Sequence, residues 1–229
     1  MANNYFDATG VLVLNRVTPV IRALFSGFKL DESYPGDGEA YIARISEDGD
    51  PQWADILDKL VQLAGDLGVP IPATDDPPME RCLVALAGYF RVEEDEALDH
   101  LIEHHAFDDT PDLEALFLIA TRFEDGHGLS AIRLEASWYC SKPRLFEFGG
   151  QGLFLSREFT HRCESSQGWE LGQAVHSSLV AGDFDAVAAL LARKMTELLN
   201  GISGATARTT VRQKLAQRLQ DSSELFGQN

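Results

Sequence analysis

The chain has 229 residues, 45% of them hydrophobic, and a formal net charge of −17 at pH 7. A chain of this length and apolar content can form a buried core without disulfides or metal ions. Its three cysteines are widely spaced and include no C-x-x-C pair. No run of 18 apolar residues is present and the first residues do not form a secretory signal, so we expect a cytoplasmic protein without membrane contact.

The first fifty residues predict a strand, a helix and a second strand. Residues 11–17 are rich in β-branched side chains, which favour strands. Thr18 followed by Pro19 is typical of a helix N-cap with proline in the first turn, so we expect a short helix over residues 20–25. Alternating side chains over residues 41–46 then predict the second strand.

The segment from about residue 50 to 106 is predicted to be mainly helical. Asp50 and Pro51 repeat the cap signature, and apolar residues from Trp53 onward recur at helical spacing. The four prolines of residues 68–78 predict a surface connection, after which apolar stripes predict two more helices.

The negative charge is concentrated in one stretch of the chain. Residues 31–126 hold 25 Asp and Glu against 5 Lys and Arg, a balance of −20, so the other 133 residues sum to −17 + 20 = +3. Such a surface repels nucleic-acid phosphates and attracts basic protein surfaces. A solvated acidic face without a partner is the alternative. The carboxylates that we assign to an interaction surface are Asp95, Glu96, Asp99, Glu103, Asp108 and Asp109.

Residues of about 115–158 show period-two alternation and predict an antiparallel β-meander. The Gly149–Gly152 run is interpreted as one of its turns. We expect Trp138 and Phe117 to point into the core beneath this sheet. The predicted strands cover residues 117–123, 132–140, 145–148 and 153–157.

The last third is predicted to be helical again, with a hairpin of two helices over residues 166–200. A basic helix and tail follow over residues 204–229. We expect this helix to dock on the acidic body of its own chain or on a second copy in a homodimer, with nucleic-acid contact as the alternative. Its cations are Arg208, Arg212, Lys214 and Arg218.

Together these patterns predict an α+β fold, in which an antiparallel β-meander packs against several helices. We expect one α+β domain over residues 1–200, followed by the C-terminal helix and tail of residues 204–229.

One motif matches a catalytic pattern. His100, Glu103 and His104 fit the H-x-x-E-H signature of zinc proteases, in which two histidines one helical turn apart bind zinc and the glutamate acts as a base. The helical spacing places both histidines away from the apolar stripe, which favours a surface pair that binds stray divalent metal. No nucleophile motif, phosphate loop or deaminase signature is present, so no cofactor is predicted.

Three segments carry a resemblance to known sequences: residues 2–14, residues 101–105 and residues 141–150. In these segments the chain resembles uncharacterised bacterial proteins carried on plasmids and integrative elements. The resemblance implies a setting in which small acidic accessory proteins inhibit host defence or manage partners.

The preferred hypothesis is therefore a non-enzymatic acidic interaction protein that binds a basic surface, as an accessory factor of a mobile element inhibiting a host nucleic-acid-binding or defence complex. A metal-dependent hydrolase at His100, Glu103 and His104 is the first alternative. Nucleic-acid contact through the C-terminal helix is the second.

Overall fold

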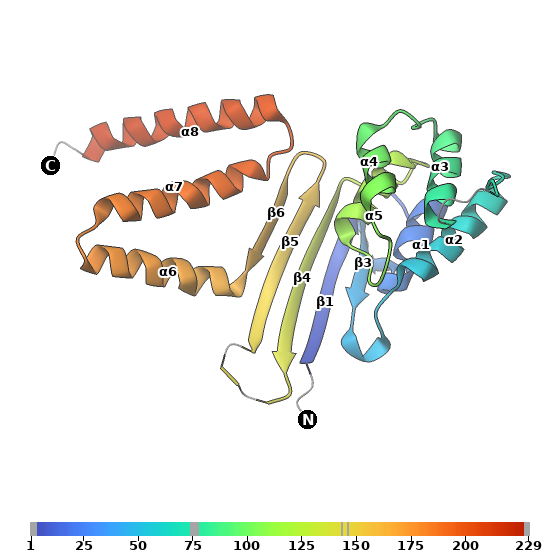
Figure 1. Cartoon of the computed structure of the whole chain (residues 1–229), viewed down its shortest axis with the longest axis horizontal. Helices are drawn as coiled ribbons and strands as arrows, with labels where there is room; N and C mark the ends of the chain where they lie inside the picture. The colour runs from blue at the N-terminus through green and yellow to red at the C-terminus, as the bar shows by residue number, and fades with distance from the viewer. Residues whose placement is uncertain (1–3, 74–77, 143, 146, 227–229) are drawn as a thin grey trace. The chain divides into compact units, whose positions relative to one another are not determined.

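The computed structural model describes residues 4–73, 78–142, 144–145 and 147–226, with the side chains of the last described turn, 222–226, left out. Within this part the chain has an α+β fold, with eight α-helices and six antiparallel β-strands (Figure 1). The predicted fold class is confirmed.

The chain divides into two compact units, Met1–Phe148 and Gly149–Asn229, called here the first and second unit. The expectation of one domain over residues 1–200 stays a prediction, because compactness in the native structure does not measure independent folding.

The first unit contains four strands in the order β2-β3-β1-β4, and all their pairings are antiparallel. The long central pair runs from Asn4 opposite Cys140 to Val13 opposite Ala131. Gly10 permits the close approach of these two strands, because a Cβ there would lie 2.1 Å from the carbonyl oxygen of Arg133. The strands are β1 (Asn4–Val13), β2 (Asp31–Pro35), β3 (Glu39–Arg44) and β4 (Ala131–Cys140).

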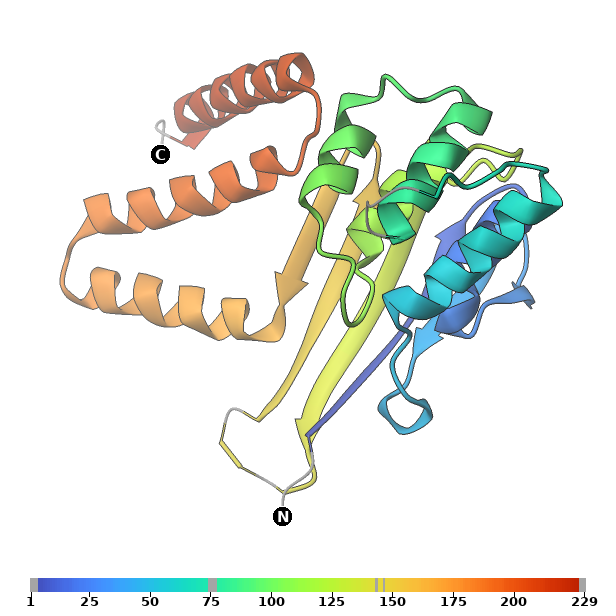
Figure 2. The same cartoon turned by 45° about the vertical axis from the view of Figure 1, so that its right-hand side comes forward.

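Five α-helices of the first unit cover one face of this sheet (Figures 1 and 2). Between them lie fully buried aromatic and aliphatic side chains, among them Trp53, Phe25 and Leu116. Burial also raises the pKa of the Cys82 thiol to about 11. The helices are α1 (Pro19–Phe25), α2 (Trp53–Asp66), α3 (Pro78–Phe90), α4 (Glu96–His104) and α5 (Leu113–Arg122), with 3₁₀ turns η1 (Ser26–Phe28) and η2 (Ser46–Asp48).

The prediction of a strand at residues 117–123 is wrong, because residues 117–122 belong to helix α5 and Phe123 is its C-cap. Asp112 caps the helix, and its side chain accepts a hydrogen bond from the Ala115 N–H at 2.7 Å. Phe117 and its neighbours are buried on nearly every side of the helix. A short run that is apolar all round has no single period, so alternation could not separate strand from helix.

The second unit contains a β-hairpin followed by three helices. Asp183 caps the second helix through the Ala186 N–H at 2.9 Å. The predicted helical hairpin and basic C-terminal helix are confirmed. The elements are β5 (Phe148–Ser156), β6 (Thr160–Glu164), α6 (Ser165–Val180), α7 (Phe184–Asn200) and α8 (Ala205–Phe226).

The predicted meander boundaries, 115–158, need correction. Gly149–Gly152 lies inside β5 rather than in a turn, and its last two residues pair with Cys163 and Glu164 of β6. The predicted strand at 145–148 overlaps β5 only at Phe148, and Phe146 lies outside the described residues. The strands β4, β5 and β6 therefore lie within residues 131–164. The glycine run did not identify a turn, because glycine adopts extended as well as turn conformations.

Candidate functional site

Helix α4 is anchored at its N-terminus by Asp95. The Asp95 carboxylate accepts a hydrogen bond from the Leu98 N–H at 3.0 Å and another from Arg122 Nε of α5 at 2.6 Å. Burial raises the pKa of Asp95, but these hydrogen bonds and the Arg122 charge outweigh it, so the pKa lies below its ordinary value. Of the predicted interaction residues, Asp95 therefore has a structural role.

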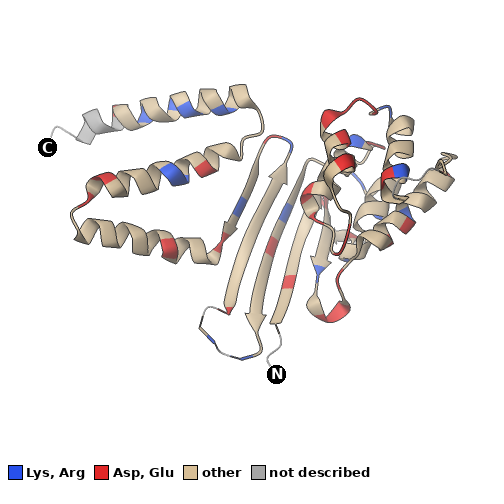
Figure 3. Cartoon of the chain, in the orientation of Figure 1, with Lys and Arg blue, Asp and Glu red and all other residues tan. Residues whose placement is uncertain are grey.

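The outer face of α4 carries carboxylates, because Leu98 and Ile102 occupy its buried face. Figure 3 shows acidic residues gathered on this helix and on the turn before it. We call the exposed members the α4 acidic cluster: Glu93, Glu94, Glu96, Asp99 and Glu103. Three of the six predicted acidic interaction residues belong to it. Glu93 and Glu94 were not among the predicted interaction residues, although the acidic run of residues 93–96 is visible in the sequence.

The α4 acidic cluster borders a groove of about 310 Å³ between α3 and α4. Carboxylates of Glu80, Asp99 and Glu103 line it together with apolar Val84 and Ile102. Arg81 also lines the groove and donates to the carbonyl oxygen of Pro72 at 3.3 Å. A groove with an acidic rim and an apolar wall suits the long side chain of a lysine or arginine, whose stem is apolar and whose tip is cationic.

Asp108 and Asp109 lie in the connection between α4 and α5, outside the α4 acidic cluster. Both are exposed, and Asp109 adopts a left-handed backbone conformation with φ of 54°. The carbonyl oxygen of Asp109 accepts a hydrogen bond from the Trp53 N–H at 3.1 Å. The rings of His105 and Phe107 pack on Trp53, with centroids 5.2 and 5.0 Å from it. The connection is therefore held in place, with two carboxylates facing solvent.

The histidines of the H-x-x-E-H motif lie on exposed positions of α4, with ring centroids 4.3 Å apart. His104 Nδ1 lies 3.1 Å from the carbonyl oxygen of His100 and 4.0 Å from a Glu103 carboxylate oxygen. Among the described residues, no three His, Cys, Asp or Glu side chains lie close enough together to hold a metal ion. Zinc sites use three or four protein ligands, and here the structure brings together two imidazoles.

A larger pocket, of about 680 Å³, lies beside the ends of β1, β3 and β4 and was not predicted. Arg44 enters it, pairs with Asp50 at 2.5 Å and lies over the Phe6 ring at 4.8 Å. Ser46 Oγ is engaged too, because it donates to the carbonyl oxygen of Phe6 at 2.6 Å. These polar side chains of the pocket wall are thus engaged in ion pairs and hydrogen bonds with neighbouring groups. Their arrangement indicates a structural contact more than a reactive site.

Trp138 also lines this pocket and is half-buried. The alternation of β4 was interpreted in the correct register, because Ile132, Ala136 and Cys140 are buried. The prediction that Trp138 lies in the core is nevertheless wrong. The pocket opens where this end of the strand lies, which leaves the ring partly exposed.

On the opposite face of the sheet, Tyr139 stacks on Tyr5 with ring centroids 5.0 Å apart. Its hydroxyl donates to an Asp7 carboxylate oxygen at 3.3 Å. Desolvation first, and then the negative charge of Asp7, raise the pKa of Tyr139 above its ordinary value. The tyrosine is therefore a hydrogen-bond donor rather than an activated phenolate.

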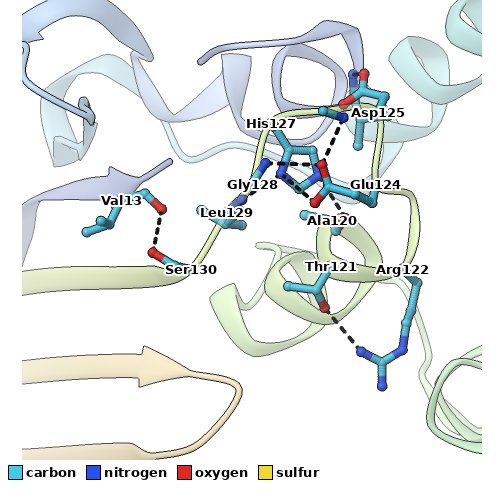
Figure 4. A network of polar contacts seen from close by, with 12 residues as sticks. Val13, Ala120, Thr121, Arg122, Glu124, Asp125, His127, Gly128, Leu129 and Ser130 are labelled. Atoms are coloured by element: carbon cyan, nitrogen blue, oxygen red, sulfur yellow. Dashed lines mark hydrogen bonds and ion pairs between the residues drawn. The ribbon is translucent and has the colours of Figure 1, made fainter. Parts of the chain in front are cut away.

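A network of polar contacts closes the connection from α5 to β4 (Figure 4). His127 is fully buried, accepts from the Leu129 N–H at 2.8 Å through Nδ1 and faces the carbonyl oxygen of Ala120 at 3.0 Å through Nε2. Glu124 accepts from the N–H groups of Gly126 and Gly128 at 2.8 and 3.1 Å. Both ring nitrogens of His127 thus have backbone partners, which indicates a structural histidine.

The four predicted cations of the C-terminal helix lie on α8. Arg208 donates to the carbonyl oxygen of Ile202 from Nε at 3.0 Å and from Nη2 at 2.8 Å. Arg212, Lys214 and Arg218 are exposed. Arg208 therefore secures the connection between α7 and α8, and three cations face solvent.

No family model matches the sequence, and neither a curated protein nor a solved structure is significantly similar to it. Over the described residues, every helix is too short or too polar to cross a membrane.

Proposed function

We propose that the chain is a non-enzymatic interaction protein of the cytoplasm whose first unit binds a basic protein surface. The observation that carries the proposal is the division of charge between the units. Residues 1–148 hold 28 Asp and Glu against 11 Lys and Arg, a balance of −17, whereas residues 149–229 hold 8 of each and sum to zero. The whole net charge therefore belongs to the first unit.

The carboxylates of the first unit are accessible to a partner. None of the described Asp and Glu side chains between residues 31 and 126 is buried. Several cations of the unit are already paired, as in Arg22 with Glu32 and Arg133 with Glu39. Such pairs leave the acidic surplus unchanged, so the field outside the unit stays negative.

Within this surface, the α4 acidic cluster and its groove are the best contact region. An exposed ion pair stabilises a complex by only about 0.2 to 1 kcal/mol, so charge alone gives weak binding unless several pairs form together. Val84 and Tyr89 of α3 are 56% and 49% exposed and supply apolar contact area on the adjoining helix. Apolar and aromatic contacts ringed by charges are the usual composition of an interface with useful affinity.

The partner that fits best is the nucleic-acid-binding face of another protein, because such faces combine dense Lys and Arg with space for phosphate groups. The resemblance to plasmid and integrative-element proteins supports a setting in which the partner is a host nucleic-acid-binding or defence complex. The hydrolase and the nucleic-acid alternatives stay predictions.

Binding of a fluorescent arginine-rich peptide, followed by anisotropy at low salt, tests the proposal. The cluster variant carries Glu94→Gln, Glu96→Gln, Asp99→Asn and Glu103→Gln. The matched control removes the same four charges from exposed positions elsewhere in the first unit: Asp37→Asn, Glu47→Gln, Asp58→Asn and Asp66→Asn.

We expect the cluster variant to raise the Kd about tenfold or more, the equivalent of about 1.4 kcal/mol, and the control to raise it less than about threefold. Equal losses in both variants would mean that net charge alone governs binding, which contradicts a local contact region. No measurable binding of the parent chain would contradict the proposal itself.

A further inference from the structure

The pocket beside the ends of β1, β3 and β4 has two aromatic rings in its wall. Phe6 and Trp138 are partners across the β1–β4 ladder, and Ala8 and Ala136 are the next pair on the same face of the sheet. The two alanines are buried, whereas both rings are half-buried. At about 680 Å³ the pocket also has the volume of a small-molecule site. It therefore combines aromatic surface with space for a ligand.

A guanidinium group of the chain itself binds to one part of this wall. Arg44 of β3 lies over the Phe6 ring, with its guanidinium carbon 4.8 Å from the ring centroid. Its Nε and Nη2 donate to the two carboxylate oxygens of Asp50 at 2.5 and 2.8 Å. Phe6 and Asp50 thus hold a guanidinium in two ways at once, by the face of an aromatic ring and by a bidentate carboxylate.

Trp138 and Glu147 bring the same two groups to the wall of this pocket. Within the part of the chain that the structure describes, no Lys or Arg lies over the Trp138 ring. The Cys140 N–H donates to the carbonyl oxygen of Glu147 at 3.0 Å, which holds this residue beside the end of β4. One carboxylate oxygen of Glu147, Oε1, lies 3.5 Å from Nη1 of Arg144. The wall therefore offers an aromatic ring and a carboxylate in addition to Phe6 and Asp50.

The other carboxylate oxygen of Glu147, Oε2, is a buried acceptor that receives no hydrogen bond from the described residues. A buried acceptor of this kind is unfavourable, and it points to a donor from outside the chain. The last torsion of a glutamate side chain is broad, so a small rotation is enough to turn Oε2 toward the pocket.

We propose that this pocket binds a small guanidinium compound, which stacks on Trp138 and donates its N–H groups to Glu147. A guanidinium is planar and carries its donors in that plane, so it can stack on a ring and pair with a carboxylate together, whereas an ammonium is a compact point charge. The acidic surplus of the first unit attracts such a cation. The site lies outside the α4 acidic cluster and does not depend on the proposed function.

Isothermal titration calorimetry of the full chain with three ligands of one size tests the proposal. Butylguanidine is cationic and planar, butylamine is cationic but not planar, and butylurea is planar but neutral. We expect butylguanidine to bind with a Kd on the order of 100 μM, which is within reach of a ligand of this size. Butylamine and butylurea should each bind about tenfold more weakly or worse, because each lacks one of the two properties.

Two variants assign the binding to named residues. Glu147→Gln keeps the shape of the side chain but removes its charge, and should raise the Kd for butylguanidine about tenfold. Trp138→Leu removes the aromatic face and should raise it about fivefold. The control is Asp58→Asn, which removes the same charge from an exposed position of α2 outside the pocket and should change the Kd less than about twofold. Circular dichroism should show equal helix content in all variants.

Three outcomes would overturn the inference: no binding of butylguanidine to the parent chain at about 10 mM, equal binding of butylamine or butylurea, or unchanged binding by Glu147→Gln. The arginine-rich peptide separates a free ligand from an arginine of a protein partner. Its affinity should be the same for the parent chain and for Glu147→Gln. A loss of peptide binding in Glu147→Gln would assign the pocket to a protein partner and contradict a small-molecule site.

Discussion

The two units of the chain differ in how many large apolar side chains they bury. In the first unit, five helices cover one face of a sheet and bury large side chains such as Trp53, Phe25 and Phe123. Among the described residues of the second unit, the buried hydrophobic side chains are Leu153, Leu155 and Leu199. The first unit holds the entire net charge and the second is neutral. One unit thus completes its own core and offers charge, whereas the other offers apolar surface.

The largest effect that separates the units should come from their tryptophans. Trp53 is 2% exposed and contacts the His105 and Phe107 rings, so Trp53→Ala should lower the free energy of unfolding by about 3 to 5 kcal/mol. Trp169 on α6 is 49% exposed, and Trp169→Ala should cost less than about 1 kcal/mol. Denaturant unfolding of the two variants measures both. Similar losses of unfolding free energy in the two variants would contradict the difference in burial between the two tryptophans.

A smaller effect should come from the anchor of α4. Asp95→Asn retains a capping side chain but loses the charge that pairs with Arg122, and we expect a loss of about 1 kcal/mol near neutral pH. Because the pKa of Asp95 is lowered in the folded state, its stabilisation is present above the unfolded pKa of about 3.9 and disappears as pH falls through the lower folded value.

Unfolding curves between about pH 6 and pH 2 measure how the stabilisation by Asp95 depends on pH. The difference in free energy of unfolding between the parent chain and Asp95→Asn should shrink toward zero at the acid end. The exposed neighbour Glu96 provides the control, in the variant Glu96→Gln, because its carboxylate has no hydrogen bond or ion pair within the described part of the chain. If the difference in free energy of unfolding between the parent chain and Asp95→Asn stayed constant with pH, the Asp95–Arg122 ion pair would contribute nothing to stability.

Much of the fold could be predicted from local signals. Helix α2 followed from its apolar spacing, although its cap position is Gln52, two residues after the predicted Asp50, which instead pairs with Arg44. Helix α5 could not be predicted, because burial on nearly all sides removes the period that distinguishes a helix from a strand. Strand β6 was missed because its short sequence, Thr160–Glu164, has no apolar alternation.

The candidate site was predictable only in part. Exposure of Asp99 and Glu103 followed from helical periodicity. The structural role of Asp95 depends on Arg122, 27 residues away, and the groove depends on α3 packing beside α4. Tertiary contacts of this kind leave no local pattern in a sequence. Helical periodicity also could not show that Phe184, Leu191 and Leu198 of α7 are exposed, because their spacing is the same as that of a core-facing stripe.

The proposed contact region can be located directly by NMR, with amide shifts of the isotope-labelled chain followed during titration with the arginine-rich peptide at low salt. We predict that the largest shifts fall on residues 93–103 and on the facing residues of α3, and that they vanish by about 0.5 M salt because screening removes the attraction. Shifts spread evenly over the acidic residues of the first unit, or concentrated on α6, α7 and α8, would contradict binding of a basic partner at the α4 acidic cluster.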